Sequence, residues 1–208
     1  MHVKLTWFFE VKTVMKKYLS TIVMLCVAAL CQAQTATAIF DKMVSTFKAS
    51  GTVSASYSMN GSKGTIVMQS AKFRILAGDV KSWFNGKTQW TYSDQTGEVN
   101  IIDPTSQELQ MTNPLAAAKS IKDAFKMAKL NSKTGYALKL TPKKKSNVKS
   151  ITLYLSKGYV LTAADYVTTN GTYKLKLTNY KTHQSYPAST FVFDKKLVPA
   201  GTEVVDLR

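Results

Sequence analysis

Short alternating segments separated by turn dipeptides are the feature that most restricts how this chain can fold. In the first of them, the apolar residues Val53, Ala55 and Tyr57 alternate with serines, so an extended backbone would carry one apolar face. Asn60-Gly61 follows, a pair typical of hairpin turns with positive φ. Repetition of this pattern predicts about eleven strands. The candidate segments are 53–59, 65–70, 72–76, 88–93, 98–102, 107–112, 136–141, 150–156, 160–168, 172–181, 190–193 and 203–207.

Two segments have helical spacing instead. Residues 35–50 repeat apolar side chains every three or four positions, and Gly51 is a natural stop. The second helix opens at Asn113-Pro114, where Asn suits the cap and Pro the first turn. Its expected apolar stripe consists of Leu115, Ala118, Ile121, Phe125 and Ala128.

The expected fold class is mainly β (α+β), an antiparallel sheet with helices on one face, in a single domain. Neighbouring strands rotate by about 20–25°, so a sheet of this length has to curl. Two main helices are too few to fill the concave side of such a sheet. The sequence therefore predicts an apolar cavity under a helical lid.

The N-terminal residues are organised as an export signal. A basic start at Met15, an apolar run over 22–30 and a small residue at Ala33 are typical of a secretory leader. We expect 1–14 to be an untranslated upstream extension, 15–33 a cleaved signal peptide, and 34–208 the mature domain. The apolar run is shorter than the roughly 20 residues that a membrane-spanning helix needs, although an uncleaved anchor helix is the alternative.

Cleavage after Ala33 would change the chemistry of the chain. It would remove Cys26 and Cys31, so the mature domain would have no disulfide, thiol nucleophile or thiolate metal site. An exported domain without disulfides depends on its hydrophobic core for stability. Of 28 basic and 12 acidic residues, 24 and 11 would remain, a net charge of +13.

This basic excess has three interpretations. Nucleic-acid binding is the usual one for a strongly basic domain, but export argues against it. The second is docking to anionic lipid headgroups or to an acidic partner. The third is solvated strand faces and turns, with 142–145 as a hairpin tip. By contrast, the lysines that line the expected second helix at three- and four-residue spacings are Lys119, Lys122, Lys126 and Lys129.

The chain offers little for catalysis. His183, the one histidine of the mature domain, stands in a polar stretch at the end of an expected strand, typical of a solvated turn. The sequence has no glycine-rich phosphate loop and no paired histidines, and the acidic residues are scattered. We therefore expect a protein that is not an enzyme and has no cofactor or metal.

Motifs spread over residues 35–208 resemble the periplasmic outer-membrane lipoprotein carrier family, the LolA-like proteins. The most specific is Asn85-Gly86-Lys87-Thr88-Gln89-Trp90-Thr91-Tyr92, which is similar to the family's DGKTLWxY hairpin. The segments 64–66 and 72–75 resemble its GxLW…PxxFRW stretch. Further similar segments are 54–58, 113–115, 140–143 and 191–204.

The resemblance implies an unclosed antiparallel half-barrel whose mouth is covered by helices and whose apolar interior holds acyl chains. It also implies a monomeric periplasmic carrier of acylated lipoproteins that binds no nucleic acid. Such a carrier takes its cargo from an inner-membrane lipoprotein-releasing transporter and delivers it to an outer-membrane acceptor. The expected cavity residues are Tyr57, Met59, Met68, Phe73, Ile75, Trp90, Leu115, Ile121 and Phe125.

Two departures from the family concern control of the lid. The best-known carriers have an Arg after the first-strand motif that ties the lid shut, and Asn60 occupies that position here. Arg74 is the nearest Arg and becomes, with Asn60, the gating candidate, while Ile75 replaces the Trp of the FRW motif. A different class of function is the alternative: a LolA-like module that senses or docks lipid or lipoprotein at the cell envelope.

Overall fold

A computed structural model of the chain describes residues 34–112 and 114–208, with the side chains of 110–116 left aside. The expected extension 1–14 and signal 15–33 lie outside the described residues. Residues Ala36–Arg208 form one compact unit. Its helices are α2 (Ala36–Ala49), α3 (Ser106–Thr112), α4 (Pro114–Ala124) and the short 3-10 helices η1 (Ala188–Phe191) and η2 (Lys195–Leu197).

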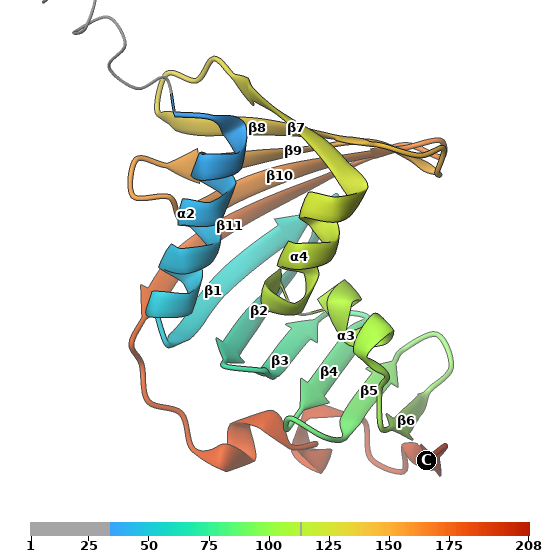
Figure 1. Cartoon of the computed structure of the whole chain (residues 1–208). Helices are drawn as coiled ribbons and strands as arrows, with labels where there is room; N and C mark the ends of the chain where they lie inside the picture. The colour runs from blue at the N-terminus through green and yellow to red at the C-terminus, as the bar shows by residue number, and fades with distance from the viewer. Residues whose placement is uncertain (1–33, 113) are drawn as a thin grey trace, which may run out of the picture. The chain divides into compact units, whose positions relative to one another are not determined.

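The described residues form one twelve-stranded sheet in the order β12-β6-β5-β4-β3-β2-β1-β11-β10-β9-β8-β7. Neighbours are antiparallel except β12 and β6, which are parallel. The sheet curls and stays open between its edge strands (Figure 1). The strands are β1 (Thr52–Met59), β2 (Ser62–Gln69), β3 (Lys72–Ala77), β4 (Val80–Phe84), β5 (Gln89–Ser93), β6 (Glu98–Ile102), β7 (Phe125–Leu130), β8 (Gly135–Pro142), β9 (Val148–Ser156), β10 (Leu161–Thr168), β11 (Thr172–Thr182) and β12 (Glu203–Asp206).

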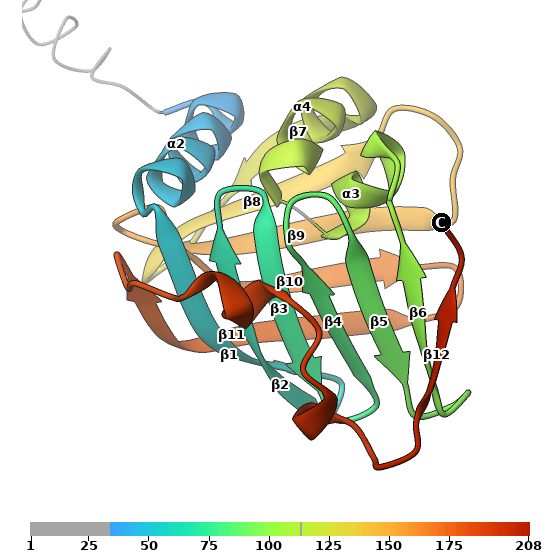
Figure 2. The ribbon, with the colours of Figure 1, turned by 90° about the horizontal axis from the view of Figure 1, so that it is seen from below.

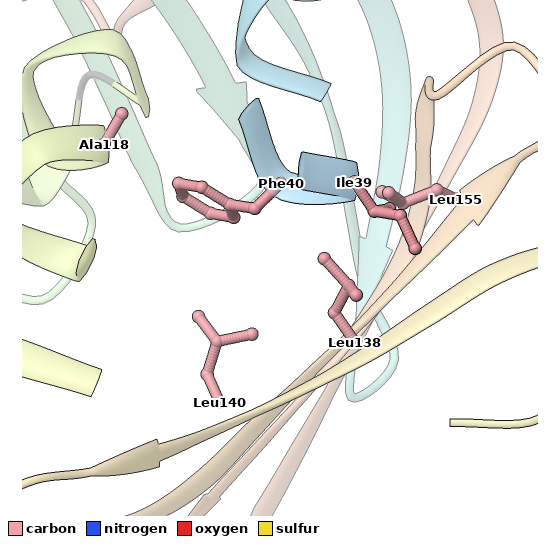
Figure 3. Packing of buried hydrophobic residues seen from close by; sticks show 6 residues of the cluster. All are labelled: Ile39, Phe40, Ala118, Leu138, Leu140 and Leu155. Atoms are coloured by element: carbon pink, nitrogen blue, oxygen red, sulfur yellow. The ribbon is translucent and has the colours of Figure 1, made fainter. Parts of the chain in front are cut away.

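Helices α2, α3 and α4 lie on one side of this sheet, which we call the inner face. Cross-strand pairing puts Ala55, Ile66 and Ile75 side by side on it. Figure 3 shows Ile39 of α2 pointing toward Leu138 of β8 and the Phe40 ring projecting toward Ala118, within a cluster completed by Leu140 and Leu155. The inner face therefore carries the main apolar core.

The opposite, outer face is covered over β3–β5 by the C-terminal segment. Trp83, Tyr92 and Val99 are buried there, and the Trp83 ring meets the Phe193 ring edge-on with centroids 5.4 Å apart. Figure 2 shows η1 and η2 running past these strands before β12 joins the sheet edge. The C-terminal segment therefore covers one half of the outer face. On the inner face, helices α2, α3 and α4 cover only part of the sheet.

Most of the predicted architecture is confirmed. The sheet is mainly antiparallel and open, α2 coincides with the helix expected over 35–50, and the Asn60-Gly61 turn has φ of 48° and 94°. Every helix within the described ranges is too short or too polar to traverse a bilayer.

Three expected elements were wrong. The strand expected over 107–112 belongs to α3, whose start has reciprocal bonds: the Thr105 N–H donates to the Glu108 carboxylate (2.7 Å) and the Glu108 N–H to Thr105 Oγ1 (3.3 Å). The second helix ends at Ala124, because the next residues pair with β8 as β7; Lys126 and Lys129 are strand residues. The strand expected over 190–193 begins as η1.

Candidate functional site

An apolar cavity of about 180 Å³ lies between α2 and the inner face of the sheet. Its walls come from α2, β1, β2, the β9–β10 turn, β10 and β11. The lining residues are Met43, Val44, Thr46, Phe47, Val53, Ala55, Ile66, Met68, Tyr159, Val160, Leu161, Leu175, Leu177 and Tyr180. This hollow lies under α2, at the middle of the strand order, whereas the helical residues expected at the cavity belong to the second helix segment.

The lining contains no charged side chain, and its polar groups are few. Burial raises the pKa of the Tyr180 hydroxyl, partly opposed by a hydrogen bond with Ser50, so this group is neutral at physiological pH. Among the described residues, no three His, Cys, Asp or Glu side chains gather in a way that could hold a metal ion. Such a lining suits an apolar ligand and offers no acid–base pair.

The size of the cavity restricts what it holds in this closed form. A dry cavity of about 150 Å³ lined by apolar side chains takes a molecule the size of benzene. Pockets for larger ligands have volumes of roughly 300–1,000 Å³. At about 180 Å³, the closed cavity has room for one segment of a single acyl chain. Several complete chains require α2 to move.

A second hollow, of about 280 Å³, lies at the C-terminal end of α2. Phe47 and Met68 line both spaces, and Lys48, Gly51 and Ser70 border the second one. Phe47 and Met68 therefore lie between the apolar cavity and a second, more polar hollow.

Helix α2 is held down mainly by its own apolar face. Ile39 and Phe40 are fully buried. On the exposed side, the Lys42 ammonium lies 5.0 Å from the centre of the Tyr159 ring. That ring stacks on Tyr136 with centroids 4.7 Å apart, and their hydroxyls are 3.1 Å apart. This hydrogen bond raises the pKa of Tyr136. The β9–β10 turn thus contacts α2, the helix that forms the lid over the cavity, through one aromatic side chain.

Two further features restrain α2. The Lys122 ammonium of α4 donates to Asp41 at 2.8 Å, in a solvent-exposed pair that contributes about 0–1 kcal/mol. At its C-terminal end, Gly51 has φ of +63° and leads directly into β1. The His183 N–H donates to the carbonyls of Ser50 (3.2 Å) and Thr52 (3.0 Å) on either side of that glycine. One end of α2 is therefore fixed, and the other depends on side-chain packing.

The structure brings several predicted cavity residues to the inner face. Met68 lines the cavity itself. Phe73 and Ile75 pack beside it in one cluster with Phe84. Ile121 and Phe125 pack against the Ile39–Phe40 cluster, on the other side of α2 from that group. These four residues surround the cavity without lining it.

Other predicted residues lie elsewhere. Tyr57 and Met59 continue the inner face of β1 beyond the cavity; burial and the nearby Asp79 raise the pKa of Tyr57, and Met59 is exposed. Trp90 pairs with Trp83 on the outer face, against the C-terminal segment. The assignment of Trp90 to the same face as Met68 is corrected here: β5 has the opposite register. The side chain of Leu115 lies outside the described residues.

Neither gating candidate touches a lid helix. The Asn60 side chain accepts the Lys174 N–H (3.0 Å) and donates to the Thr172 carbonyl (3.4 Å), so it fastens the β1–β2 hairpin to β11. Arg74 pairs with Val67 and Trp83, which places it on the outer face.

Sequence reasoning missed most of the cavity lining, which comes from α2, β1, β2, the β9–β10 turn, β10 and β11. Leu175 and Leu177 alternate with lysines, a signal that marks one face as apolar. Nothing in that alternation says which helix lies over the face. Tyr159 has φ of +61°, and no sequence motif distinguishes it from an ordinary turn residue.

One family model and several solved structures match this chain. The model of the family "Outer membrane lipoprotein carrier protein LolA" matches residues 27–163. A search of curated proteins finds no match. Among solved structures, an uncharacterized conserved protein from Thermus thermophilus is similar, with a TM-score of 0.56, 15% identity and coverage of 83% of this chain and 99% of that one.

Two further solved structures are similar at a lower level. A LolA superfamily protein from Nitrosomonas europaea has a TM-score of 0.40, 12% identity, and coverage of 77% of this chain and 99% of that one. The MucA/MucB complex of Pseudomonas aeruginosa has a TM-score of 0.43, 12% identity, and coverage of 77% and 62%.

Proposed function

The chain belongs to the LolA family of outer membrane lipoprotein carrier proteins, and on that premise we propose that it binds the acyl chains of lipoproteins beneath α2. In this proposal it carries them from the inner to the outer membrane. The observation that supports it is the uncharged apolar cavity between α2 and the sheet. The absence of charge there favours binding over catalysis, so we propose a carrier that is not an enzyme.

The energetics of membrane release explain why such cargo needs a carrier. One myristoyl chain binds a bilayer with an association constant near 10⁴ M⁻¹, about 5.5 kcal/mol. Two or three chains would hold a lipoprotein by on the order of 11–16 kcal/mol if their contributions add. Escape into water is therefore very slow, and a carrier has to offer similar apolar burial.

Movement of α2 can exchange burial of its own side chains for burial of an acyl chain. Lifting Ile39 and Phe40 out of the core exposes two fully buried side chains, at a cost of roughly 3–6 kcal/mol. One incoming acyl chain gains a comparable amount, so loading and closing are nearly balanced. The remaining contacts of α2 then decide which state is populated.

The acyl-chain site would extend beyond the closed cavity once α2 moves. Phe73 and Ile75 on one side, and Ile121 and Phe125 on the other, would then become walls of a single channel. Tyr57 and Met59 lie further along the same face, toward its exposed end. The gating role assigned by analogy to Asn60 and Arg74 passes in this proposal to Lys42 and Tyr159.

The proposed partners are acylated lipoproteins, an inner-membrane releasing transporter and an outer-membrane acceptor, met by a monomer in the periplasm. The family and the export signal expected over residues 15–33 support that location. A sensing module is the second candidate. It is favoured by the closed cavity of about 180 Å³, which suits detection of one chain better than transport of three.

Depletion of the protein in its native cells separates the two candidates. For a carrier, lipoproteins accumulate in the inner membrane fraction; for a sensor, their distribution stays normal and only an envelope stress response changes. The mature chain (34–208) should also retain a triacylated lipopeptide through gel filtration, and should not retain its deacylated form. Equal retention of both forms would end the proposal of acyl binding.

A further inference from the structure

Charge is distributed very unevenly over the folded unit. Residues 125–182, which form β7–β11, contain 12 lysines, no arginine and one acidic residue, Asp165. The rest of residues 34–208 contains 12 basic and 10 acidic residues. Nearly all of the net positive charge therefore belongs to one half of the sheet.

Strand register places part of this charge on the outer face. Leu175 and Leu177 line the cavity, so Lys174 and Lys176 between and beside them point to the other side. Lys139 stands between Leu138 and Leu140, which are buried on the inner face, and Lys126 stands between Phe125 and Met127 in the same way. All four lysines are exposed.

No helix of the described chain covers these four lysines (Figure 1), and no ion pair within residues 34–112 and 114–208 involves any of them. Asp165 is the nearest acid by register, opposite Lys174, and it accepts a hydrogen bond from the Tyr154 hydroxyl at 3.0 Å. Helices α2 and α4 lie on the other side of β7–β11, and the outer side of these strands is bare (Figure 1).

We propose that the outer face of β7–β11 is a docking surface for bilayers rich in anionic phospholipid. The chemistry of the face favours lipid over an acidic protein. Protein interfaces are enriched in arginine and depleted in lysine, and this half of the sheet has lysine alone. A headgroup layer presents diffuse charge without fixed geometry, which flexible lysines match, and juxtamembrane lysines add affinity in this way.

Docking through this face leaves the lid free. The cavity and α2 are on the inner side of the sheet, so attachment by the outer side does not occupy them. The attachment would hold the protein at a membrane surface and would weaken with salt. It goes beyond the proposed function, because it requires only a charged bilayer and no acyl cargo.

The test is co-sedimentation of the mature chain with vesicles. One set is pure phosphatidylcholine, and the other contains roughly 30% phosphatidylglycerol to give an anionic surface. We expect binding to the anionic vesicles alone, and its loss at high salt. Each lysine on the face should contribute about fivefold, so K126Q/K139Q/K174Q/K176Q should bind roughly 600-fold more weakly if the contributions add.

A charge-matched control distinguishes the face from the net charge. K87Q/K119Q/K195Q/K196Q removes four exposed lysines from the other half of the unit and should stay within about threefold of the wild type. D165N, which removes the one acid of the basic half, should bind severalfold more tightly and does not depend on the quadruple variant folding.

Three results would overturn the proposal. One is equal binding to neutral and anionic vesicles, and another is equal loss in the two quadruple variants. The third is no vesicle binding at all, which would favour an acidic protein as the partner of this face. Acyl binding is measured separately with a lipopeptide in the absence of vesicles, so failure of one proposal does not count against the other.

Discussion

Filling the cavity tests whether it is the acyl-chain site. Ala55 is buried in β1, lines the cavity and pairs with Ile66 of β2. Ala55→Leu adds three carbons to the wall, which gain about 2.4 kcal/mol of burial at ~0.8 kcal/mol per carbon. Imperfect fit reduces this by about 1–3 kcal/mol. A cavity of about 180 Å³ accommodates the larger side chain, so we expect a small net stabilisation.

The same three carbons exclude part of the ligand. If an acyl chain loses contacts worth about 2.4 kcal/mol, its affinity falls roughly 50-fold. Displacement of a fluorescent fatty acid measures that affinity, and a thermal melt measures stability. Each kcal/mol of stabilisation should raise the Tm by about 2–4 °C for a domain of this size.

Ala163→Leu is the matched control. Ala163 lies in β10 opposite Lys176, on the outer face, so the same addition there leaves the cavity unchanged. Its acyl affinity should equal that of the wild type. If Ala55→Leu folds with an unchanged circular dichroism spectrum and still binds the fatty acid normally, the ligand lies elsewhere and the reasoning fails.

Three further predictions concern the lid and its surroundings. Gly51→Ala places a Cβ at a residue with φ of +63°, where no atom lies within 4 Å of it. Backbone strain alone should therefore lower the free energy of unfolding, measured in urea, by about 1–2 kcal/mol. An unchanged value would mean that the backbone relaxes. Lys42→Met removes the cation over Tyr159 and keeps an apolar stem, so the contact that holds α2 in place should weaken by about 0.5–1 kcal/mol. Fatty-acid association measured by stopped flow should then be two- to fivefold faster. An unchanged rate would exclude this contact from gating. Hydrogen bonds from Thr105 lower the pKa of Glu108 below 4.5, so the capping contribution to α3 is complete above that pH and disappears as pH falls through the folded pKa. The amide protection factors of α3, which compare each rate with that of an unfolded chain at the same pH, should fall in that window, and Glu108→Gln should lack this dependence.

The sequence predicted local structure well where one pattern acted alone. The helix α2 has an uninterrupted apolar spacing and a glycine stop, and Asn60-Gly61 has the dipeptide that a tight hairpin turn requires. Prediction from the sequence failed where two patterns overlapped. Phe125 fits the helical stripe of α4 and also alternates with Lys126, and pairing with β8 decided in favour of a strand.

The sequence predicted the apolar character of the candidate site but not which faces of the strands form it. Alternation told which residues of one strand share a face, and the structure packs Phe73 and Ile75 of β3 in one apolar cluster with Met68 of β2. Alternation could not tell which side of β5 meets the helices, and Trp90 was therefore placed on the wrong face. A strand pattern has two faces, and a shift of one residue exchanges them.

The sequence by itself determined the curled antiparallel sheet, the apolar face of α2 and the concentration of lysines in residues 125–182, because each follows from local spacing or composition. Only the tertiary structure decided that α2 covers β1, β2 and β11, that Tyr159 meets Lys42, and that four lysines share a bare outer face. These are contacts between residues far apart in the chain. Packing of the whole sheet selects them, and no local pattern records that selection.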